Sequence, residues 1–175
     1  RIPTAKAYLK AGLKQSQTKL ILELKPSKVS KDRTLKAAKL VVDMVKELQA
    51  EEMVEYISFS YDALKRIRDL DPKAKIAYLN GAVKPSKLKE DGISGLDFHI
   101  NAYKKNPSWI KESHKLGLTV NVWTVNTIDD INHFIHEDVD FITTDEPETV
   151  FSILQKNKCN YFIVYKISGY ITQKR

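Results

Sequence analysis

Two ionisable side chains stand out in a short apolar segment near the start of the chain. Glu23 and Lys25 flank Leu24 at the end of the run Leu20-Ile21-Leu22-Glu23-Leu24. Side chains alternate along a strand, so Glu23 and Lys25 share one face. A carboxylate in such a strand is costly unless a positive group meets it. The pattern leaves two interpretations open: a metal ligand beside an anion-binding lysine, or a structural ion pair.

Trp123 is the next residue of interest, because it lies near the end of another apolar strand segment, Thr119 to Val125. Its alternation with Asn121 and Val125 puts these three side chains on one face. In the core, the indole would fill space. In a site, it would form a wall for the apolar or polyol part of a substrate, and the sequence leaves both interpretations open.

Polar residues also accompany three other segments. Asp97 and His99 alternate with apolar neighbours and could face one end of a barrel, although a hydrogen-bonded surface histidine is the simpler interpretation. Asp145 is interpreted as the N-cap of the last helix. Ser58 and Ser60 are predicted to make hydrogen bonds within a loop.

Strand and helix patterns alternate along residues 1–156. Strands are predicted near 20–24, 54–59, 75–79, 96–100, 119–125 and 140–143, and helices near 5–13, 32–50, 60–70, 85–91, 106–116 and 147–156. Strands joined by helical crossovers are parallel and covered on both faces. This predicts either an open doubly wound sheet or an eight-unit barrel of which this chain lacks two strands. No G-x-G-x-x-G or P-loop follows a strand, which disfavours the nucleotide-binding sheets.

Composition limits the classes of function. The chain has 175 residues, enough for one core, and no apolar run long enough to cross a bilayer. Five of its basic residues follow position 155, so residues 1–155 carry 24 basic and 22 acidic side chains, a net charge of +2. A nucleic-acid partner is therefore not expected. The single Cys159 excludes an internal disulfide and a cysteine-based zinc cage.

Two parts of the chain stay unassigned. Residues 157–175 form a basic, β-prone tail that could be an added strand, an arm that meets a partner, or a segment without a role in the fold. The sequence begins at Arg1 without Met or a signal-like segment, so we expect upstream sequence to be missing and assign no compartment.

An ordered set of short motifs over residues 1–156 resembles the glycerophosphodiester phosphodiesterase family. The motifs are Ile2-Pro3-Thr4 leading into a helix, Leu22-Glu23-Leu24-Lys25, Ile57-Ser58-Phe59-Ser60, Val120-Asn121-Val122-Trp123-Thr124-Val125-Asn126 and Asp140-Phe141-Ile142-Thr143-Thr144-Asp145-Glu146-Pro147. The resemblance implies an incomplete TIM-type (β/α)8 barrel of the α/β class, with about six of the eight strands in this chain. Residues 1–156 would be the C-terminal three-quarters of that barrel.

The resemblance also implies an activity. Family members use a divalent cation, calcium or magnesium, to hydrolyse glycerophosphodiesters to glycerol 3-phosphate and an alcohol. By position, Glu23 resembles the metal-binding glutamate, Lys25 the lysine near the phosphate, and Trp123 the aromatic residue that lines the substrate pocket. The family's His-Arg pair, its E-x-D metal ligands and its second histidine have no counterpart in this sequence. The isolated chain is therefore expected to have little activity.

Two rival functions remain. One is a catalytically silent barrel remnant acting in binding or assembly, whose missing strands would leave exposed edges for pairing with another chain. The other is a different phospholipase-like phosphodiesterase on the same fold, such as a sphingomyelinase D type, because a fold does not fix its substrate.

Overall fold

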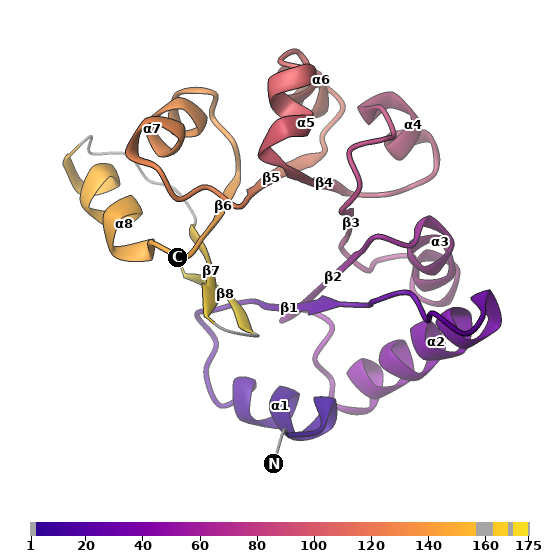
Figure 1. The fold of residues 1–175 in the computed structure, drawn as a ribbon. Coiled ribbons are helices and arrows are strands. Elements are labelled where there is room, and N and C mark those ends of the chain that lie inside the picture. The colour runs from indigo at the N-terminus through magenta and orange to yellow at the C-terminus, as the bar shows by residue number, and fades with distance from the viewer. Residues whose placement is uncertain (1–2, 157–162, 168–169, 175) are drawn as a thin grey trace.

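The computed structural model describes residues 3–156, 163–167 and 170–174, the last two segments by their backbone. Figure 1 looks along a closed ring of strands with helices around its outside. Six parallel strands, each paired with the next along the chain, form most of the ring: β1 (Leu20–Glu23), β2 (Val54–Ser58), β3 (Ile76–Tyr78), β4 (Gly95–His99), β5 (Thr119–Trp123) and β6 (Phe141–Thr144). The predicted incomplete (β/α)8 barrel, with six of its strands in this chain, is confirmed.

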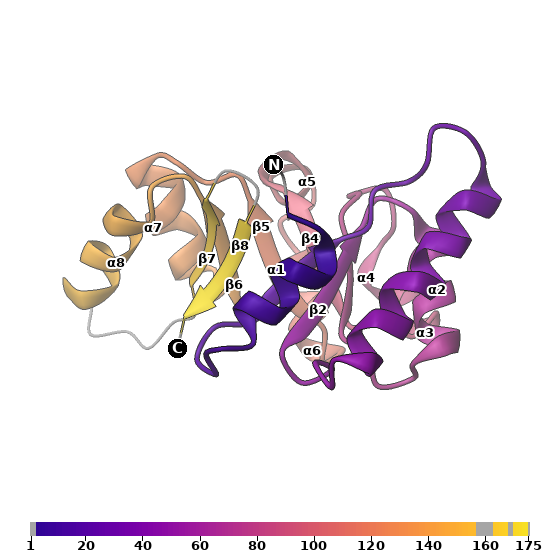
Figure 2. The ribbon, with the colours of Figure 1, turned by 90° about the horizontal axis from the view of Figure 1, so that it is seen from below.

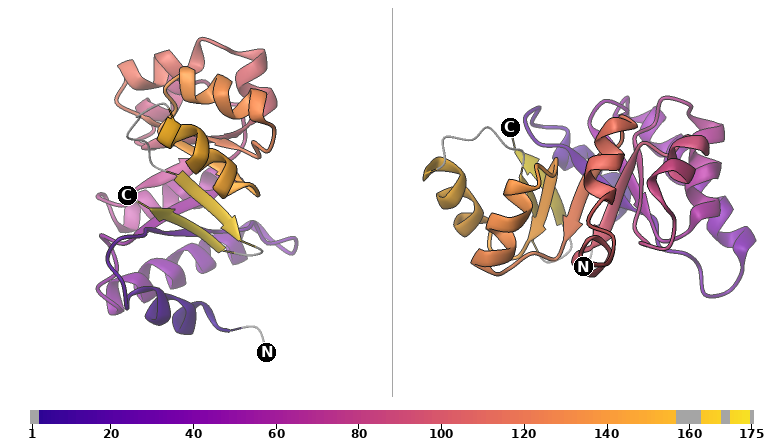
Figure 3. Two further views of the ribbon diagram at one scale, coloured as in Figure 1. Left: turned by 90° about the vertical axis from the view of Figure 1, so that its left-hand side faces the viewer. Right: turned by 90° about the horizontal axis from the view of Figure 1, so that it is seen from above.

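The helices lie between the strands in sequence and surround the ring in space (Figures 2 and 3). They are α1 (Ala5–Gly12), α2 (Lys31–Glu47), α3 (Tyr61–Leu70), α4 (Pro85–Glu90), α5 (Ile100–Lys105), α6 (Trp109–Lys115), α7 (Ile128–His136) and α8 (Pro147–Lys156). The helix predicted near 106–116 is found as α6, and a further short helix, α5, precedes it. Asn106 ends α5, because a residue before a proline, here Pro107, is disfavoured in helical conformation. None of the helices in the described part of the chain is long and apolar enough to cross a membrane.

A hairpin from the tail completes the ring. Strands β7 (Ile163–Ile167) and β8 (Tyr170–Lys174) pair with each other antiparallel, β7 pairs parallel with β6, and β8 pairs antiparallel with β1. The open edges expected for β1 and β6 are therefore not found among the described strands, because the hairpin backbone pairs with both. Of the three alternatives for the tail, added strands describe its two visible segments, and its other residues lie outside the described ones.

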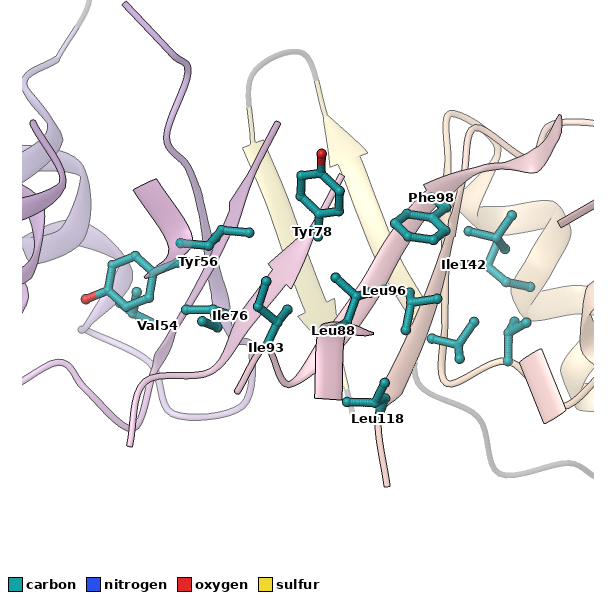
Figure 4. Packing of buried hydrophobic residues seen from close by; sticks show 14 of the residues in the cluster. Val54, Tyr56, Ile76, Tyr78, Leu88, Ile93, Leu96, Phe98, Leu118 and Ile142 are labelled. Atoms are coloured by element: carbon teal, nitrogen blue, oxygen red, sulfur yellow. The ribbon is translucent and has the colours of Figure 1, made fainter. Parts of the chain in front are cut away.

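The two faces of the six strands differ in polarity. Outward side chains such as Tyr56, Ile76, Leu96 and Phe98 are at most 2% exposed and pack beneath the helices (Figure 4). Burying a large apolar side chain in this way contributes about 1.5–3 kcal/mol. The alternate, inward positions carry polar side chains, including Glu23, Glu55, Asp97, Asn121 and Thr143. The layer between strands and helices is thus the apolar core, and the interior of the ring is available for polar chemistry.

Side-chain caps fix where helices leave the barrel. Thr4, Ser30, Ser60 and Thr127 each accept a hydrogen bond from a backbone N–H in the first turn of the helix that follows. Each such cap contributes about 1 kcal/mol. Ser60 and Thr127 stand at the carboxyl ends of β2 and β5. They therefore hold in place the loops that border one mouth of the barrel.

Candidate active site at the mouth of the barrel

A pocket of about 240 Å³ opens at the carboxyl ends of the strands. Its lining combines two carboxyl groups, one amine, two aromatic side chains, two aliphatic side chains and two threonines: Glu23, Lys25, Ile57, Phe59, Leu79, Asp97, Trp123, Thr124 and Thr143. The three residues that the family resemblance assigned to the site, Glu23, Lys25 and Trp123, all lie in it. In parallel α/β barrels this end is where catalytic groups gather.

Glu23 and Lys25 face the pocket together, as strand alternation predicted. The Nζ of Lys25 lies 3.7 Å from Oε2 of Glu23, and the two side chains are 79% and 31% exposed. An ion pair this open to solvent contributes little stability, about 0–1 kcal/mol. The structural ion pair is thus present, but its modest value leaves the carboxylate and the amine available to other partners in the pocket.

Asp97 lies deeper, on β4, and is only 4% exposed. Its Oδ1 accepts a hydrogen bond of 2.6 Å from Nδ2 of Asn121, which also donates to Oγ1 of Thr143 at 2.9 Å. Burial raises the pKa of Asp97 to about 7, an effect that the Asn121 hydrogen bond opposes and the charge of Glu23 reinforces. A buried carboxyl that titrates near neutrality inside a pocket is characteristic of a functional site.

Trp123 is positioned by a hydrogen bond to the neighbouring strand β4. Its Nε1 donates to the backbone oxygen of Asp97 at 2.8 Å, and its ring meets Phe59 edge to face at 6.0 Å between centroids. The imidazole of His99 packs against the same indole at 4.9 Å. Trp123 is therefore a pocket wall rather than a filled core position.

His99 makes the local contacts expected of a hydrogen-bonded surface histidine. Its Nδ1 accepts a hydrogen bond from the backbone N–H of Asn101 and so caps α5. The prediction for the two serines is also confirmed, since Oγ of Ser58 donates to the Leu24 backbone and accepts from the N–H of Ser60. These contacts tie the ends of β1 and β2 together beneath Glu23 and Lys25.

The helix cap predicted at Asp145 is wrong. Helix α8 begins at Pro147, and the turn before it is closed by Oγ1 of Thr144, which accepts from the N–H of Glu146. The carboxylate of Asp145 instead accepts from Nδ2 of Asn126 at 2.9 Å. The reason is geometric. The end of β6 lies beside the loop after β5, so the Asp145 carboxylate lies within hydrogen-bonding distance of Asn126.

Phe59 is the pocket residue that sequence reasoning missed. It belongs to the Ile57-Ser58-Phe59-Ser60 motif, but the sequence analysis assigned it no role, although alternation puts it on the inward face with Ile57. Although β2 ends at Ser58, Phe59 keeps the inward orientation of Ile57 and contacts Trp123. A large apolar residue directly before a helix-capping serine was the available signal.

The donor set is a partial match to a divalent cation. Glu23 offers carboxylate oxygens of the type that calcium and magnesium prefer, and Asp97 lies in the same pocket. Such ions take six or more oxygens, and the part of the chain that the structure describes holds no group of three His, Cys, Asp or Glu side chains able to bind a metal ion. The residues present therefore fit one part of a cation site, in which Glu23 would be a ligand.

A larger cavity, about 480 Å³, lies at the amino ends of the strands. Lys19, Glu55, Lys75 and Asp140 are among its lining residues. Glu55 pairs with Lys75 at 3.8 Å, and Asp140 accepts hydrogen bonds from His114 and the Val120 N–H. These charged groups are thus paired with one another or hydrogen-bonded to the backbone at the start of a strand.

Comparison with known proteins establishes the class of protein that this fold and pocket define. The model of the glycerophosphoryl diester phosphodiesterase family matches residues 1–149. The chain belongs to this family, as the motif resemblance predicted.

Individual relatives agree with the family assignment. A solved glycerophosphodiester phosphodiesterase from Parabacteroides distasonis superposes with a TM-score of 0.86 at 42% identity, over 89% of this chain and 65% of that one. A glycerophosphodiester phosphodiesterase from Caldanaerobacter subterraneus is 30% identical over 120 residues, which are 66% of this chain and 48% of that protein. A phosphodiesterase from Oleispira antarctica, solved with its product sn-glycerol-3-phosphate, shares the fold with a TM-score of 0.65 at 22% identity, over 78% of this chain and 55% of that one. The chain thus spans about half to two-thirds of the length of these relatives.

Proposed function

We propose that this chain supplies the cation- and phosphate-binding side of a site that hydrolyses glycerophosphodiesters to glycerol 3-phosphate and an alcohol. The observation that carries the proposal is the meeting of Glu23, Lys25, Asp97 and Trp123 in one pocket at the carboxyl end of a family barrel. A single side chain of this set would have many explanations. Their convergence in one pocket, from β1, β4 and β5, has few explanations other than a shared site.

The division of labour follows from the charge of the substrate. A phosphodiester is anionic and repels a nucleophile, and its charge grows in the transition state. Calcium or magnesium, held in part by Glu23, would offset that charge. Lys25 is 79% exposed at the rim, so its ammonium group is free to turn from Glu23 toward a phosphate oxygen. Trp123, held in place by its Nε1 hydrogen bond, would form a wall that limits where the organic part of the substrate can lie.

The proton-transfer groups are not in the described lining. Attack by water requires a base and departure of the alcohol requires an acid, commonly a histidine. Among the described residues that line the pocket there is no histidine, and His99 lies behind Trp123 with Nδ1 already engaged. We therefore propose that this segment acts within a larger polypeptide whose remaining part brings the acid, the base and further cation ligands.

Activity measurements test the proposal directly. The complete polypeptide that contains this segment should release glycerol 3-phosphate from glycerophosphocholine with calcium or magnesium, and Glu23→Gln should lower kcat/KM at least 10³-fold. The 175-residue chain alone should show little or no turnover. Robust turnover by the short chain, or an active Glu23→Gln enzyme, would contradict these assignments.

A catalytically silent remnant, or a sphingomyelinase D type of activity, remains the alternative. The buried Asp97, whose pKa is raised to about 7, favours a working site over a remnant, because keeping such a group in a merely structural barrel costs stability. Release of glycerol 3-phosphate, as against a ceramide phosphate from sphingomyelin, separates the two enzymatic alternatives.

A further inference from the structure

The loop between β1 and α2, residues 24–30, rises above the other loops at the mouth of the barrel (Figure 2). It presents Val29, which is 73% exposed, the highest value among the exposed large hydrophobic residues in the described part of the chain. One exposed apolar side chain is ordinary on a protein surface, so its meaning depends on what surrounds it.

Hydrogen bonds hold this loop in an ordered turn. Oγ of Ser27 accepts from the N–H of Val29 at 3.2 Å, and the N–H of Ser27 donates to Oγ1 of Thr34 on α2 at 2.9 Å. Ser30 then caps α2 by accepting from the N–H of Arg33. Val29 is therefore presented to solvent by a turn that is anchored to the helix behind it.

The residues around Val29 are mostly basic. Positions 25–33 hold four basic side chains and one acidic side chain, a net charge of +3: Lys25, Lys28, Lys31, Arg33 and Asp32. Two neighbouring carboxylates oppose this charge, since Asp62 pairs with Lys31 at 2.7 Å and Glu23 lies 3.7 Å from Lys25. Both pairs are open to solvent, which weakens them. Lys28, directly beside Val29, is also exposed.

The opposite side of the mouth has the reverse charge. There the exposed apolar residue is Ile128, 61% exposed at the start of α7 and followed by Asp129 and Asp130, of which the second is paired with a lysine. Asp145 and Glu146, after the end of β6, add two exposed carboxylates. The rim is thus basic beside β1 and acidic beside β5 and β6.

A surface of anionic lipid matches the basic side of the rim in two respects. Lysines close to such a surface are attracted by its negative potential, and an apolar side chain at the apex gains burial between the headgroups. A stable protein partner would match less well, because a specific protein interface takes about 800 Å² from each side, far more than the tip of one loop offers.

We propose that the β1–α2 loop, through Val29 and the lysines beside it, docks the mouth of the barrel on an anionic lipid surface. The acidic side of the rim is repelled by that surface, so the barrel is tilted and its mouth stays open beside the headgroups. This inference goes beyond the proposed function and does not depend on it.

The test is sedimentation of the complete polypeptide that contains this segment with lipid vesicles, in chelator and without substrate. Vesicles of phosphatidylcholine alone are compared with vesicles in which about one third of the lipid is phosphatidylserine. The partition coefficient should be about tenfold larger for the anionic vesicles. The difference should shrink severalfold when the salt concentration is raised from about 0.1 M to about 0.5 M.

Three variants localise the effect. Lys28→Ala removes one charge beside the apex and Val29→Ser removes its apolar group, and each should weaken partition onto the anionic vesicles about fivefold. Ile128→Ser is the matched control, because it removes an exposed apolar side chain from the acidic side of the same rim, and it should partition as the parent does. Thermal unfolding should be the same for all three, since these side chains are exposed.

The proposal would be overturned by equal partition onto neutral and anionic vesicles, or by parent-like partition of both loop variants. A loss in Ile128→Ser as large as that in Val29→Ser would also overturn it, as would the absence of vesicle binding by a chain that captures an acidic protein instead. A polypeptide that partitions as predicted but releases no glycerol 3-phosphate would uphold the docking surface and contradict only the proposed function.

Discussion

The two ends of this barrel contain similar residue types and use them differently. At the amino end, Glu55 pairs with Lys75 and Asp140 is hydrogen-bonded to His114 and the backbone, around a cavity of about 480 Å³. At the carboxyl end, Asp97 is buried with no basic partner within hydrogen-bonding distance among the described residues, beside Glu23 and Trp123, in about 240 Å³. Cavity size therefore misidentifies the site. The site is identified instead by a buried carboxyl group, Asp97, that has no basic side chain to offset its charge among the described residues.

Burial raises the pKa of both interior carboxyls, but the partners differ. For Glu55 the effect of burial is opposed by the charges of Lys75 and Lys19. For Asp97 it is opposed by an amide hydrogen bond and reinforced by Glu23. At the amino end, lysine charges thus oppose the cost of burying the Glu55 carboxylate. At the carboxyl end no basic side chain opposes the same cost for Asp97, which is the situation of a carboxyl group in a site that receives a cation.

The largest predicted difference between the ends is in the pH dependence of stability. The folded-state pKa of Asp97, about 7, lies above that of an unfolded aspartate, so the folded protein holds an extra proton between these values. The free energy of unfolding should therefore fall as pH rises from about 4 to 7 and then level off. Asp97→Asn should remove that loss and stabilise the chain at pH 8 by on the order of 3 kcal/mol, with little effect at pH 4.

Glu55→Gln is the matched control for this measurement, because Glu55 is also an interior carboxyl. Urea denaturation across the pH range should show a smaller gain for it, since Lys75 already offsets part of the cost of its charge. Equal gains for the two variants would remove the distinction between the ends.

A middle-sized effect is predicted for anion binding. Lys25→Ala should weaken binding of glycerol 3-phosphate, measured by calorimetry with calcium present, about tenfold, which corresponds to about 1.4 kcal/mol. Lys75→Ala removes an amine of the same type from the other end and should leave the affinity unchanged. A phosphate site at the amino end would give the opposite ranking.

The smallest effect concerns the structural role of the amino end. His114→Gln should cost about 1 kcal/mol of stability, because the contact of its Nε2 with Asp140 is lost or weakened. Ligand binding at the mouth should not change. A loss of glycerol 3-phosphate affinity in this variant would show that the two ends are coupled.

Much of this molecule could be predicted from local patterns. Alternation placed Glu23 and Lys25 on one face, and the βα periodicity gave six strands in the correct order. The hairpin could not be chosen from the sequence, because β8 pairs with β1 across nearly the whole chain length. The site was harder: the importance of Asp97 depends on burial and on Asn121 from another strand, which spacing along one segment does not reveal. Phe59 was missed because a large apolar residue at a strand end fits a core position as well as a pocket wall.

We propose that the mouth carboxylate Glu23, and not the amino-end carboxylate Glu55, is one of the ligands of a divalent cation. Thermal unfolding of the complete polypeptide that contains this segment, with and without calcium or magnesium, tests this most directly, since a ligand that binds the native state raises its apparent stability. We predict a rise in Tm for the parent chain and for Glu55→Gln, and none for Glu23→Gln. A rise that survives Glu23→Gln and disappears in Glu55→Gln would place the cation at the other end of the barrel and contradict this account.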